Sequence, residues 1–410
     1  MKILLLTQWF DPEPTLKGLV FARELKRQGH DVQVLTGFPN YPGGKIYSGY
    51  KLKFKETEFI EGIEVTRVAL YPSHDSSALK RIFNYISFAF MALLFGLFAT
   101  KKVDVIYAYH PPLTVGIAAI LIKFFRRIPV VYDIQDMWPD TLQATGMLNN
   151  KKILNFIGYI CNIVYKYVDH IVVLSPGFKK LLIERKVKEE KISIIYNWCN
   201  EEELKNKVEL KEDYSDIFLQ KFNLIFAGNL GKAQGLDTLV EVADKLKANE
   251  SIQFIFVGDG TEKDHLINQV YDRNLKNVLF IPRVPMSEVG GILEKADVLI
   301  VHLKDDKLFQ ITIPSKTQAY MAIGKPILMA VKGDASDIIK YAQAGAIAQP
   351  ENIESILKAI NYLYESSSSD LIQMGVNSKK YYMDNMSLEK SCEKFIDVFE
   401  MVRRKENSNV

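Results

Sequence analysis

The sequence predicts an α/β protein built from two doubly wound halves, in which parallel sheets carry helices on both faces. Three observations lead to this fold class. The chain has 410 residues, too many for one ordinary hydrophobic core. Short apolar runs alternate with helical periodicity from end to end, as they do where crossover helices join parallel strands. The content of 48% hydrophobic and 25% charged residues is typical of a folded globular protein.

The first half begins with an apolar run in "MKILLLTQWFDPEP". Its five apolar residues are too few for the core of a signal peptide, so residues 2–7 are predicted to form the first strand. Further strands are predicted at residues 31–36, 65–70, 105–109, 130–133, 171–174 and 192–195. Helical periodicity is clearest at residues 19–28 and 153–167.

A charged, irregular stretch at residues 200–219 is predicted as a linker. The alternation then resumes, with strands at residues 223–227, 253–257, 278–281, 298–302 and 326–330, and helices at 236–246, 261–273, 286–295 and 316–323. After residue 378 the chain is predicted to be helical to about residue 404. The expected domains are residues 1–200 and 201–385, followed by a C-terminal helix within residues 386–410.

Charge is spread unevenly along the chain. Residues 1–200 hold 26 Lys and Arg against 17 Asp and Glu, whereas residues 201–410 hold 26 against 32. A basic first half indicates an anionic partner, although simple drift in surface composition would give the same asymmetry. The three cysteines, Cys161, Cys199 and Cys392, lack CxxC spacing, which indicates a reducing compartment and provides no metal framework.

Residues 82–100, "IFNYISFAFMALLFGLFAT", carry no charge and lie between paired basic residues. A helix of about 20 residues can cross a bilayer. Crossing would place strands of one sheet on opposite sides of the membrane, so a spanning helix is rejected. Two alternatives stay open: a helix buried on the flank of the sheet, or a helix in the membrane interface with its basic ends at the headgroups.

In an open parallel sheet, ligands bind beyond the carboxyl ends of the strands, and two such halves facing each other would form a cleft. The stretch "IFAGNLGKAQG", residues 225–235, follows the first strand of the second half. Gly228 and Gly231 would let the backbone approach a phosphate, and Lys232 adds charge. The spacing fits neither a Walker loop nor G-x-G-x-x-G, and a tight turn without a ligand is the alternative.

A second anion site is predicted in "TIPSKTQAYMAIGKPIL", where a helix begins on the cleft side. Ser315 is the expected N-cap, and the first-turn N–H groups with Lys316 and the nearby Thr312 would bind a diphosphate. Simple helix capping is the alternative. Because the chain has no Asp-x-Asp motif, lysines and helix ends would neutralise the diphosphate instead of a metal. In "IPRVPMSE", the bend at Arg283 and Val284 could offer backbone groups to a nucleobase.

The first half offers candidates for binding a second substrate. In "AYHPPLTVG", His110 lies between a strand and a helix, where it could bond a substrate hydroxyl or a developing charge. Gly18 begins the first helix and could let the backbone approach a ligand. Carboxylates and an indole that could bind sugar hydroxyls and stack on a sugar ring follow the next strand, at Asp133, Asp136, Asp140 and Trp138. A structural histidine and ordinary turn or capping chemistry are the alternatives.

Five stretches resemble, in this order, family 4 of the retaining glycosyltransferases: "RELKRQGHDVQVLTGFPNYP", "YDIQDMWPD", "FAGNLGKAQGLDTLVEVADKL", "FVGDGTEKDHL" and "TIPSKTQAYMAIGKPIL". The resemblance is strongest to the bacterial branch that includes N-acetylfucosamine transferases of O-antigen and capsule assembly. It implies the GT-B fold, two Rossmann-like domains with the final helix crossing back to the first. It also implies a UDP-sugar held mainly by the second domain, with no essential metal or other cofactor.

The resemblance also assigns site residues. His110 takes the position of the family's histidine near the donor sugar, and Gly228 that of the glycine in the diphosphate loop. The family often has an arginine and a lysine nearby, but Asn229 and Gln234 occupy those positions here. Lys232 is therefore expected to supply the charge.

The largest departure from the family concerns two glutamates spaced eight residues apart, the second of which usually binds the ribose. Their positions fall on Ile311 and Ala319, which cannot do so. The adjacent Gln310 and Gln318 could substitute for them.

The function implied is retaining transfer of an N-acetylated hexose or deoxyhexose from a UDP-sugar to a sugar on an undecaprenyl diphosphate carrier, in O-antigen or capsule assembly. The enzyme would be cytoplasmic, attached peripherally to the inner face of the bacterial membrane, with no nucleic-acid partner. Lys232 and Lys316 would stabilise the leaving diphosphate. Two alternatives remain: a UDP-sugar 2-epimerase of the same architecture, and a non-catalytic binding subunit of a polysaccharide assembly complex, which the missing glutamates keep open.

Overall fold

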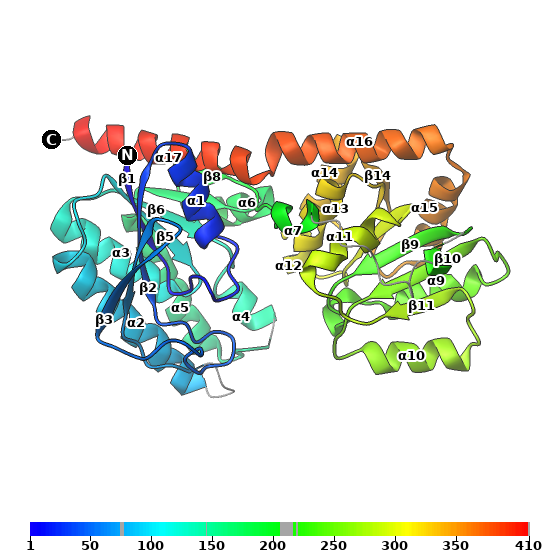
Figure 1. The fold of residues 1–410 in the computed structure, drawn as a ribbon, viewed down its shortest axis with the longest axis horizontal. Helices are drawn as coiled ribbons and strands as arrows, with labels where there is room; N and C mark the ends of the chain where they lie inside the picture. Colours follow the sequence, from blue (N-terminus) through cyan, green and yellow to red (C-terminus); the bar gives the residue numbers. More distant parts are fainter. Residues whose placement is uncertain (74–77, 145, 206–215, 219, 409–410) are drawn as a thin grey trace. The chain divides into compact units, whose positions relative to one another are not determined.

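The computed structural model describes residues 1–73, 78–144, 146–205, 216–218 and 220–408. The chain divides into two compact units (Figure 1). Unit 1 comprises Met1–Tyr196 together with Leu388–Val410, and unit 2 comprises Asn197–Ser387. The last helix, α17 (Leu388–Ser408), therefore belongs to the same unit as the first strand.

Unit 1 contains an eight-stranded sheet with the order β3-β4-β2-β1-β5-β6-β7-β8. The strands are β1 (Lys2–Leu6), β2 (Asp31–Gly37), β3 (Lys55–Ile60), β4 (Ile63–Val68), β5 (Val105–His110), β6 (Val130–Ile134), β7 (His170–Val173) and β8 (Ile192–Ile194). All neighbours pair in parallel except β3 and β4. Central strands such as β6 are buried throughout because helices cover both faces of the sheet. The antiparallel edge strand β3 was not predicted, because "KETEFI" alternates between exposed and half-buried residues and lacks an apolar run.

The helices of unit 1 are α1 (Leu19–Arg27), α2 (Ala78–Phe98), α3 (Leu113–Arg126), α4 (Asp140–Ala144), α5 (Lys151–Tyr167), α6 (Pro176–Glu184) and α17. Helices α2, α3 and α5 contact one another in series, whereas α17 packs against α1 (Figure 1). Phe395 of α17 lies edge-on to Phe21 of α1 and to Tyr107 of β5, with ring centroids 5.2 Å and 5.6 Å apart. The C-terminal helix is thus part of the core of unit 1.

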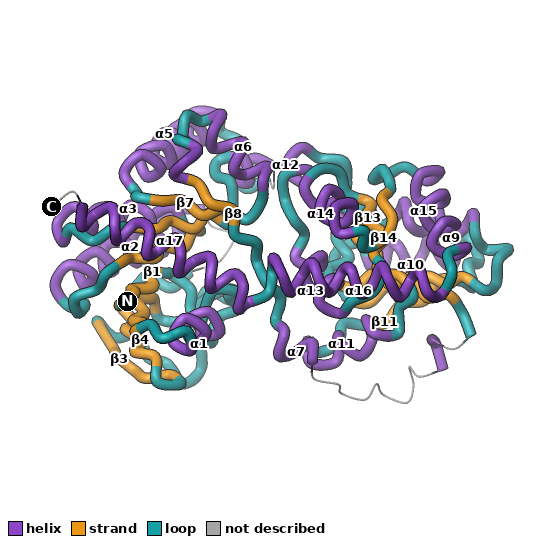
Figure 2. Tube along the Cα trace, turned by 90° about the horizontal axis from the view of Figure 1, so that it is seen from above, coloured by secondary structure: helices purple, strands orange, loops and turns teal. Residues whose placement is uncertain are grey.

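Unit 2 contains a six-stranded parallel sheet with the order β11-β10-β9-β12-β13-β14. Strands β11, β13 and β14 of this sheet are labelled in Figure 2. Its strands are β9 (Phe222–Ala227), β10 (Ile252–Val257), β11 (Val278–Ile281), β12 (Val298–His302), β13 (Ile327–Ala330) and β14 (Gly345–Ile347). The first five were predicted from their apolar runs. The sixth was not predicted, because three residues are too short for a periodic signal.

The helices of unit 2 are α7 (Glu201–Lys205), α9 (Asp237–Lys245), α10 (Lys263–Asp272), α11 (Met286–Glu294), α12 (Lys307–Gln310), α13 (Ser315–Ile323), α14 (Asp334–Ala342), α15 (Ile353–Glu365) and α16 (Ser368–Asn385). The expected linker at residues 200–219 in fact begins with α7, which packs against α11 and α13. The middle of that stretch, residues 206–215, lies outside the described residues.

Candidate functional site

The turn after β9 brings backbone and glycines close to the carboxyl end of the sheet. Gly228 has φ +139°, a conformation that side chains with a Cβ rarely adopt. A Cβ on Gly258 would lie 2.0 Å from the Gly228 carbonyl oxygen, so the turns after β9 and β10 are in direct backbone contact. The Leu230 N–H donates to the Asp259 carbonyl at 2.8 Å and fixes this arrangement. A rigid turn of backbone dipoles therefore follows β9.

Lys316 lies next to this turn. Gly228 has no side chain, and a Cβ built on it would lie 3.4 Å from Lys316 Nζ. The amine of Lys316 therefore lies directly beside the turn. The same Nζ is 3.4 Å from the centroid of the Phe226 ring. Among the described residues it is buried without a hydrogen-bond partner. Burial lowers the pKa of Lys316 from 10.5 to about 7. The structure thus brings Gly228 and Lys316 together, as the two predicted anion elements require.

Helix α13 is fixed at this place by Tyr320. The Tyr320 hydroxyl accepts the Ala227 N–H at 2.8 Å and donates to the Ala227 carbonyl at 3.2 Å, at the last residue of β9. The prediction of Ser315 as N-cap was wrong. The helix begins at Ser315, and the capping position is Pro314, which offers no side-chain bond. Ser315 is exposed and, together with Lys316, supplies first-turn N–H groups that have no intrahelical acceptor.

Two predicted donor-binding glutamines are held by the protein itself. Gln234 Oε1 accepts the Gly231 N–H at 3.2 Å and caps the short 3₁₀ turn Lys232–Gln234. The amide nitrogen of Gln318, in the orientation that satisfies its neighbours, donates to the Pro314 and Ser315 carbonyls at 2.9 Å each. Gln318 is only 3% exposed. Both side chains shape the two anion elements and point their polar groups at backbone.

The remaining predicted donor residues differ in their surroundings. Asn229, Lys232 and Arg283 are exposed, and Val284 is half-buried. Thr312 is half-buried, and its hydroxyl donates to the Leu308 carbonyl at 2.8 Å. The side chain of Lys232 is therefore exposed to solvent, whereas the amine of Lys316 is buried beside the glycine turn.

His110 ends β5 in unit 1, and it is 1% exposed. Its Nδ1 has no hydrogen-bond partner among the described residues. Burial lowers the pKa of His110 to about 3, so the imidazole is neutral at physiological pH. The ring lies edge-on to Trp138 at 5.2 Å and to Tyr132 at 5.7 Å. The structure thus brings together two residues that were predicted separately, His110 and Trp138.

Asp133 is placed as a structural residue. Its Oδ2 lies 2.5 Å from Nζ of Lys17, and both side chains are fully buried. The Tyr107 hydroxyl donates to the same oxygen at 2.5 Å, and the Gln135 amide donates to Oδ1 at 2.7 Å. Both oxygens are thus occupied, and no surface is left for a sugar hydroxyl. Asp136 is half-buried, which raises its pKa.

The space beside Gly18 is also filled by the protein itself. A Cβ there would lie 2.1 Å from Asp11 Oδ2, which accepts the Leu19 N–H at 2.6 Å at the start of α1. The glycine therefore makes room for a carboxylate cap. Asp140, the third acidic residue noted after β6, pairs with Arg185 at the surface.

One unusual carboxylate was missed. Glu13, within "DPEP", is 2% exposed, and its two oxygens accept N–H groups of Phe10, Asn40 and Tyr41. Burial outweighs these donors and raises its pKa to about 7. In the sequence, the feature that could have pointed to Glu13 is its position between two prolines just after a strand.

Two further features bear on the site. Within the described part of the chain, no three His, Cys, Asp or Glu side chains gather as a metal ion would require. Metal independence remains a prediction.

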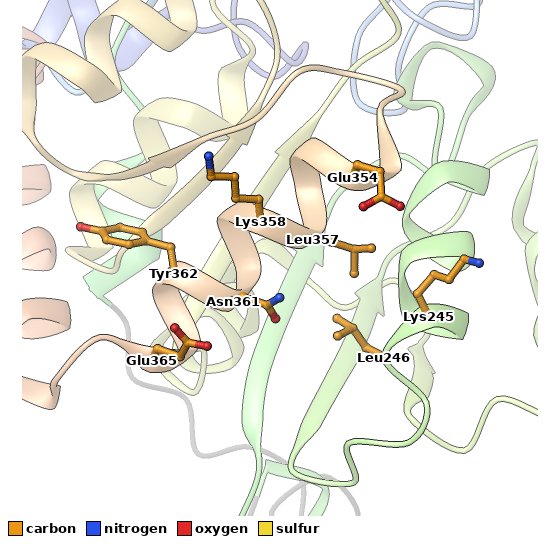
Figure 3. A pocket seen from close by; sticks show the side chains of 8 residues that line it. All are labelled: Lys245, Leu246, Glu354, Leu357, Lys358, Asn361, Tyr362 and Glu365. Atoms are coloured by element: carbon orange, nitrogen blue, oxygen red, sulfur yellow. The ribbon is translucent and has the colours of Figure 1, made fainter.

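An open hollow of about 600 Å³ lies between the end of α9 and α15, with Leu246 and Leu357 facing each other (Figure 3). It is at the opposite end of α9 from the glycine turn and is separate from the site.

The chain is similar to known proteins over most of its length. The family described as "Glycosyl transferase 4-like domain" matches residues 19–198, and "Glycosyl transferases group 1" matches residues 207–381. The protein WcaI of Escherichia coli (strain K12), whose name assigns it as a glycosyl transferase of colanic acid biosynthesis, is 26% identical over 88% of this chain and 91% of its own length. The glycosyltransferase WbjE of Pseudomonas aeruginosa is 25% identical over 75% of this chain and 77% of its own.

Solved structures share the fold. Anabaena HepE in complex with UDP superposes with a TM-score of 0.70, covering 98% of this chain and 100% of that chain at 15% identity. Sucrose-phosphate synthase from Thermosynechococcus elongatus gives a TM-score of 0.70 at 14% identity, covering 98% of each chain. The predicted fold class is confirmed. With a 4-like domain followed by a group 1 domain in the two-domain GT-B fold, this chain is a glycosyltransferase.

Proposed function

We propose that this glycosyltransferase moves an N-acetylated hexose or deoxyhexose from a UDP-sugar to a lipid-linked glycan, with retention at the anomeric carbon, during assembly of a surface polysaccharide such as O-antigen or capsule. The assignment to polysaccharide assembly is supported by WcaI, whose name places it in colanic acid biosynthesis. A uridine nucleotide donor is supported by HepE, which was solved with UDP and with UDP-glucose.

The observation that carries the proposal is the buried amine of Lys316 beside the glycine turn. An unpartnered buried ammonium is costly, because it loses hydration and gains no acceptor in return. A diphosphate against Gly228 would supply that acceptor, together with the N–H groups that begin α13. The site is therefore suited to bind two negative charges with protein groups alone.

In the proposed reaction, the bond between the anomeric carbon and the diphosphate oxygen breaks, and a bond to the acceptor oxygen forms on the same face. The proton of the acceptor hydroxyl passes to a diphosphate oxygen. Negative charge on the diphosphate grows as the bond breaks, so Lys316 stabilises the transition state more than the bound donor. A neutral His110 serves to hold a sugar hydroxyl through Nδ1, which has no hydrogen-bond partner within the described part of the chain.

The acceptor is proposed to be a sugar on undecaprenyl diphosphate, reached from the cytoplasmic face of the membrane. Two features of unit 1 support a lipid-borne acceptor: the excess of basic residues in the first half, and the apolar helix α2.

The test is a donor screen with purified protein, with and without a lipid fraction that carries undecaprenyl-diphosphate-linked sugars. UDP release that requires the acceptor, and a product with the donor's anomeric configuration by NMR, would support the proposal. Donor interconversion without acceptor would show an epimerase. Failure to bind any uridine nucleotide would point to a non-catalytic subunit.

A further inference from the structure

Helix α2 is attached to unit 1 along one side only. Within the described residues, Leu79–Phe98 is long and apolar enough to cross a membrane, yet most of this helix is not buried inside the protein. Its inner side packs on β2 and β4, and Asn84 bonds to Gln8, Asn40 and the Tyr71 carbonyl. These contacts keep α2 on the sheet, so its outer side is a surface.

The neighbouring helices extend this apolar surface. Helix α3 contacts both α2 and α5, and the three lie side by side over one face of the sheet (Figure 1). Phe83 and Phe90 on α2 are 62% and 64% exposed, and Phe124 and Phe125 on α3 are 78% and 66% exposed. Further exposed apolar side chains on these helices are Leu79, Ile82, Ile86, Phe98, Leu121, Ile153, Phe156, Tyr159 and Tyr167. We call this surface, formed by α2, α3 and α5, the three-helix face.

The charge on the three-helix face has one sign. The helices contain 21, 14 and 17 residues, without a single Asp or Glu. Their seven basic residues are Lys80, Arg81, Lys123, Arg126, Lys151, Lys152 and Lys166. Acidic residues make up 49 of the 410 positions overall, yet none falls in these three helices, so every charged side chain on them is basic. Aromatic side chains on helices whose own charged residues are all basic suit an anionic lipid surface.

A basic hollow adjoins the last turns of α3 and α5. It has a volume of about 400 Å³ and is lined by Lys123, Lys166, Tyr167, Val168, Asp169, Lys188, Glu190, Lys191 and Lys405. The lining of this hollow contains five lysines and two acidic residues. Lys123 pairs with Asp169 at 2.6 Å, and Lys191 donates to the Tyr165 carbonyl at 2.7 Å. The hollow offers excess positive charge beside the three-helix face, where a phosphate headgroup would be held.

We infer that the three-helix face binds the surface of a bilayer containing anionic phospholipids, with the aromatic side chains of α2, α3 and α5 in the interface and the lysines at the phosphates. The inference deepens the proposed function and rests on its membrane-side acceptor. A second copy of the chain is a poorer occupant, because the same basic helices would meet each other and repel.

The experiment is flotation of the full-length protein with vesicles of phosphatidylcholine alone or with phosphatidylglycerol added. Binding is expected only to the vesicles with phosphatidylglycerol, and it should weaken as salt is raised. Replacing Phe124→Ser and Phe125→Ser together should lower binding by about tenfold or more, since each ring loses its apolar insertion. The change Lys151→Glu with Lys152→Glu should lower it by about tenfold through charge alone.

The matched control is Tyr271→Ser on α10 of unit 2, an aromatic residue that is 83% exposed and outside the three-helix face. It should bind vesicles like the unchanged protein. Thermal unfolding of each variant checks that it folds. Equal binding to both vesicle types, full binding by the Phe124/Phe125 variant, or a dimer in solution that this variant abolishes would each overturn the inference.

UDP binding by calorimetry separates the two proposals. Because the Phe124/Phe125 and Lys151/Lys152 substitutions all lie in unit 1, both of these variants should bind UDP with unchanged affinity. Normal vesicle binding without acceptor-dependent transfer would count against the proposed function alone. Normal transfer to a detergent-solubilised acceptor without vesicle binding would count against the three-helix face alone.

Discussion

The Nζ atom of Lys316 lies 3.4 Å from the centroid of the Phe226 ring, at the end of the strand that leads into the glycine turn. The negative face of an aromatic ring attracts an ammonium, but it does not accept hydrogen bonds as an oxygen does. The amine is therefore held at a defined position while its donors stay available. This relationship is the physical basis of the proposed donor site.

Replacing Lys316 with Ala should reduce turnover by about 10²–10³-fold, because one preorganised donor to the developing charge is lost. The measurement is acceptor-dependent UDP release at saturating donor. Lys245→Ala, at the far end of α9, is the matched lysine control and should be near normal. Turnover within a few-fold of the unchanged enzyme for Lys316→Ala would remove its catalytic role.

UDP affinity should depend on pH through Lys316. The free site has a pKa of about 7, and a bound diphosphate favours the charged amine, so binding takes up a proton above pH 7. Affinity should therefore fall by up to about tenfold per unit as the pH rises above 7. Calorimetry in two buffers of different ionisation enthalpy measures the proton uptake. No uptake between pH 7.5 and about 9 would show that the amine is charged in the free protein, since the phosphate itself is ionised there.

Lys316→Met should stabilise unit 2 while abolishing tight UDP binding. The pKa of Lys316 falls from 10.5 to about 7 on folding, so the unfolded chain holds more protons between these values. The loss of folding free energy caused by burying a charged Lys316 is complete below pH 7 and disappears as the pH rises towards 10.5. At neutral pH the gain should be on the order of 1–3 kcal/mol, because Met packs on the ring without a buried charge. Denaturant unfolding at pH 6.5 and 9.5 tests this, and an equal gain at both would argue against titration as the cause.

Asp133→Asn should destabilise unit 1 and leave UDP binding intact. Removing the carboxylate leaves the buried Lys17 ammonium without its counter-charge, which costs about 3–5 kcal/mol. Chemical denaturation followed by Trp fluorescence measures the loss, and calorimetry with UDP is the control on unit 2. A stable Asp133→Asn protein with a raised KM for the acceptor would instead favour the acceptor-binding role predicted from the sequence.

His110→Asn should lower turnover without changing its pH profile between pH 5 and 8. The pKa of His110 is about 3, so the imidazole is already neutral across that range. Losing the hydrogen bond proposed between His110 and the sugar should cost about 10–10²-fold in kcat, with little effect on UDP affinity. If turnover of the unchanged enzyme varies with pH around 6.5 and this variation is absent from His110→Asn, the histidine titrates during the reaction.

The sequence alone determined the alternation of strands and helices, the two halves, and the turns that follow β9 and precede α13. These features are local, because a run such as Phe222–Ala227 or the periodicity of Asp237–Lys245 reports the burial of neighbouring positions along one element. Gly228 and Lys316 were predicted to bind an anion from the turn and the helix start that they occupy, and this role stays a prediction. The unpredicted strand β3 shows the limit, since an exposed edge strand has no apolar period to detect.

Only the tertiary structure decided which polar side chains are free for a ligand. Lys17 and Asp133 are 116 positions apart and meet in a buried pair, and no local pattern reveals that pairing. Among the described residues, Lys316 Nζ has no hydrogen-bond partner, and it lies against the ring of Phe226, a residue far earlier in the chain. Whether a polar group has a partner depends on contacts between distant segments, and only packing of the whole unit brings those segments together.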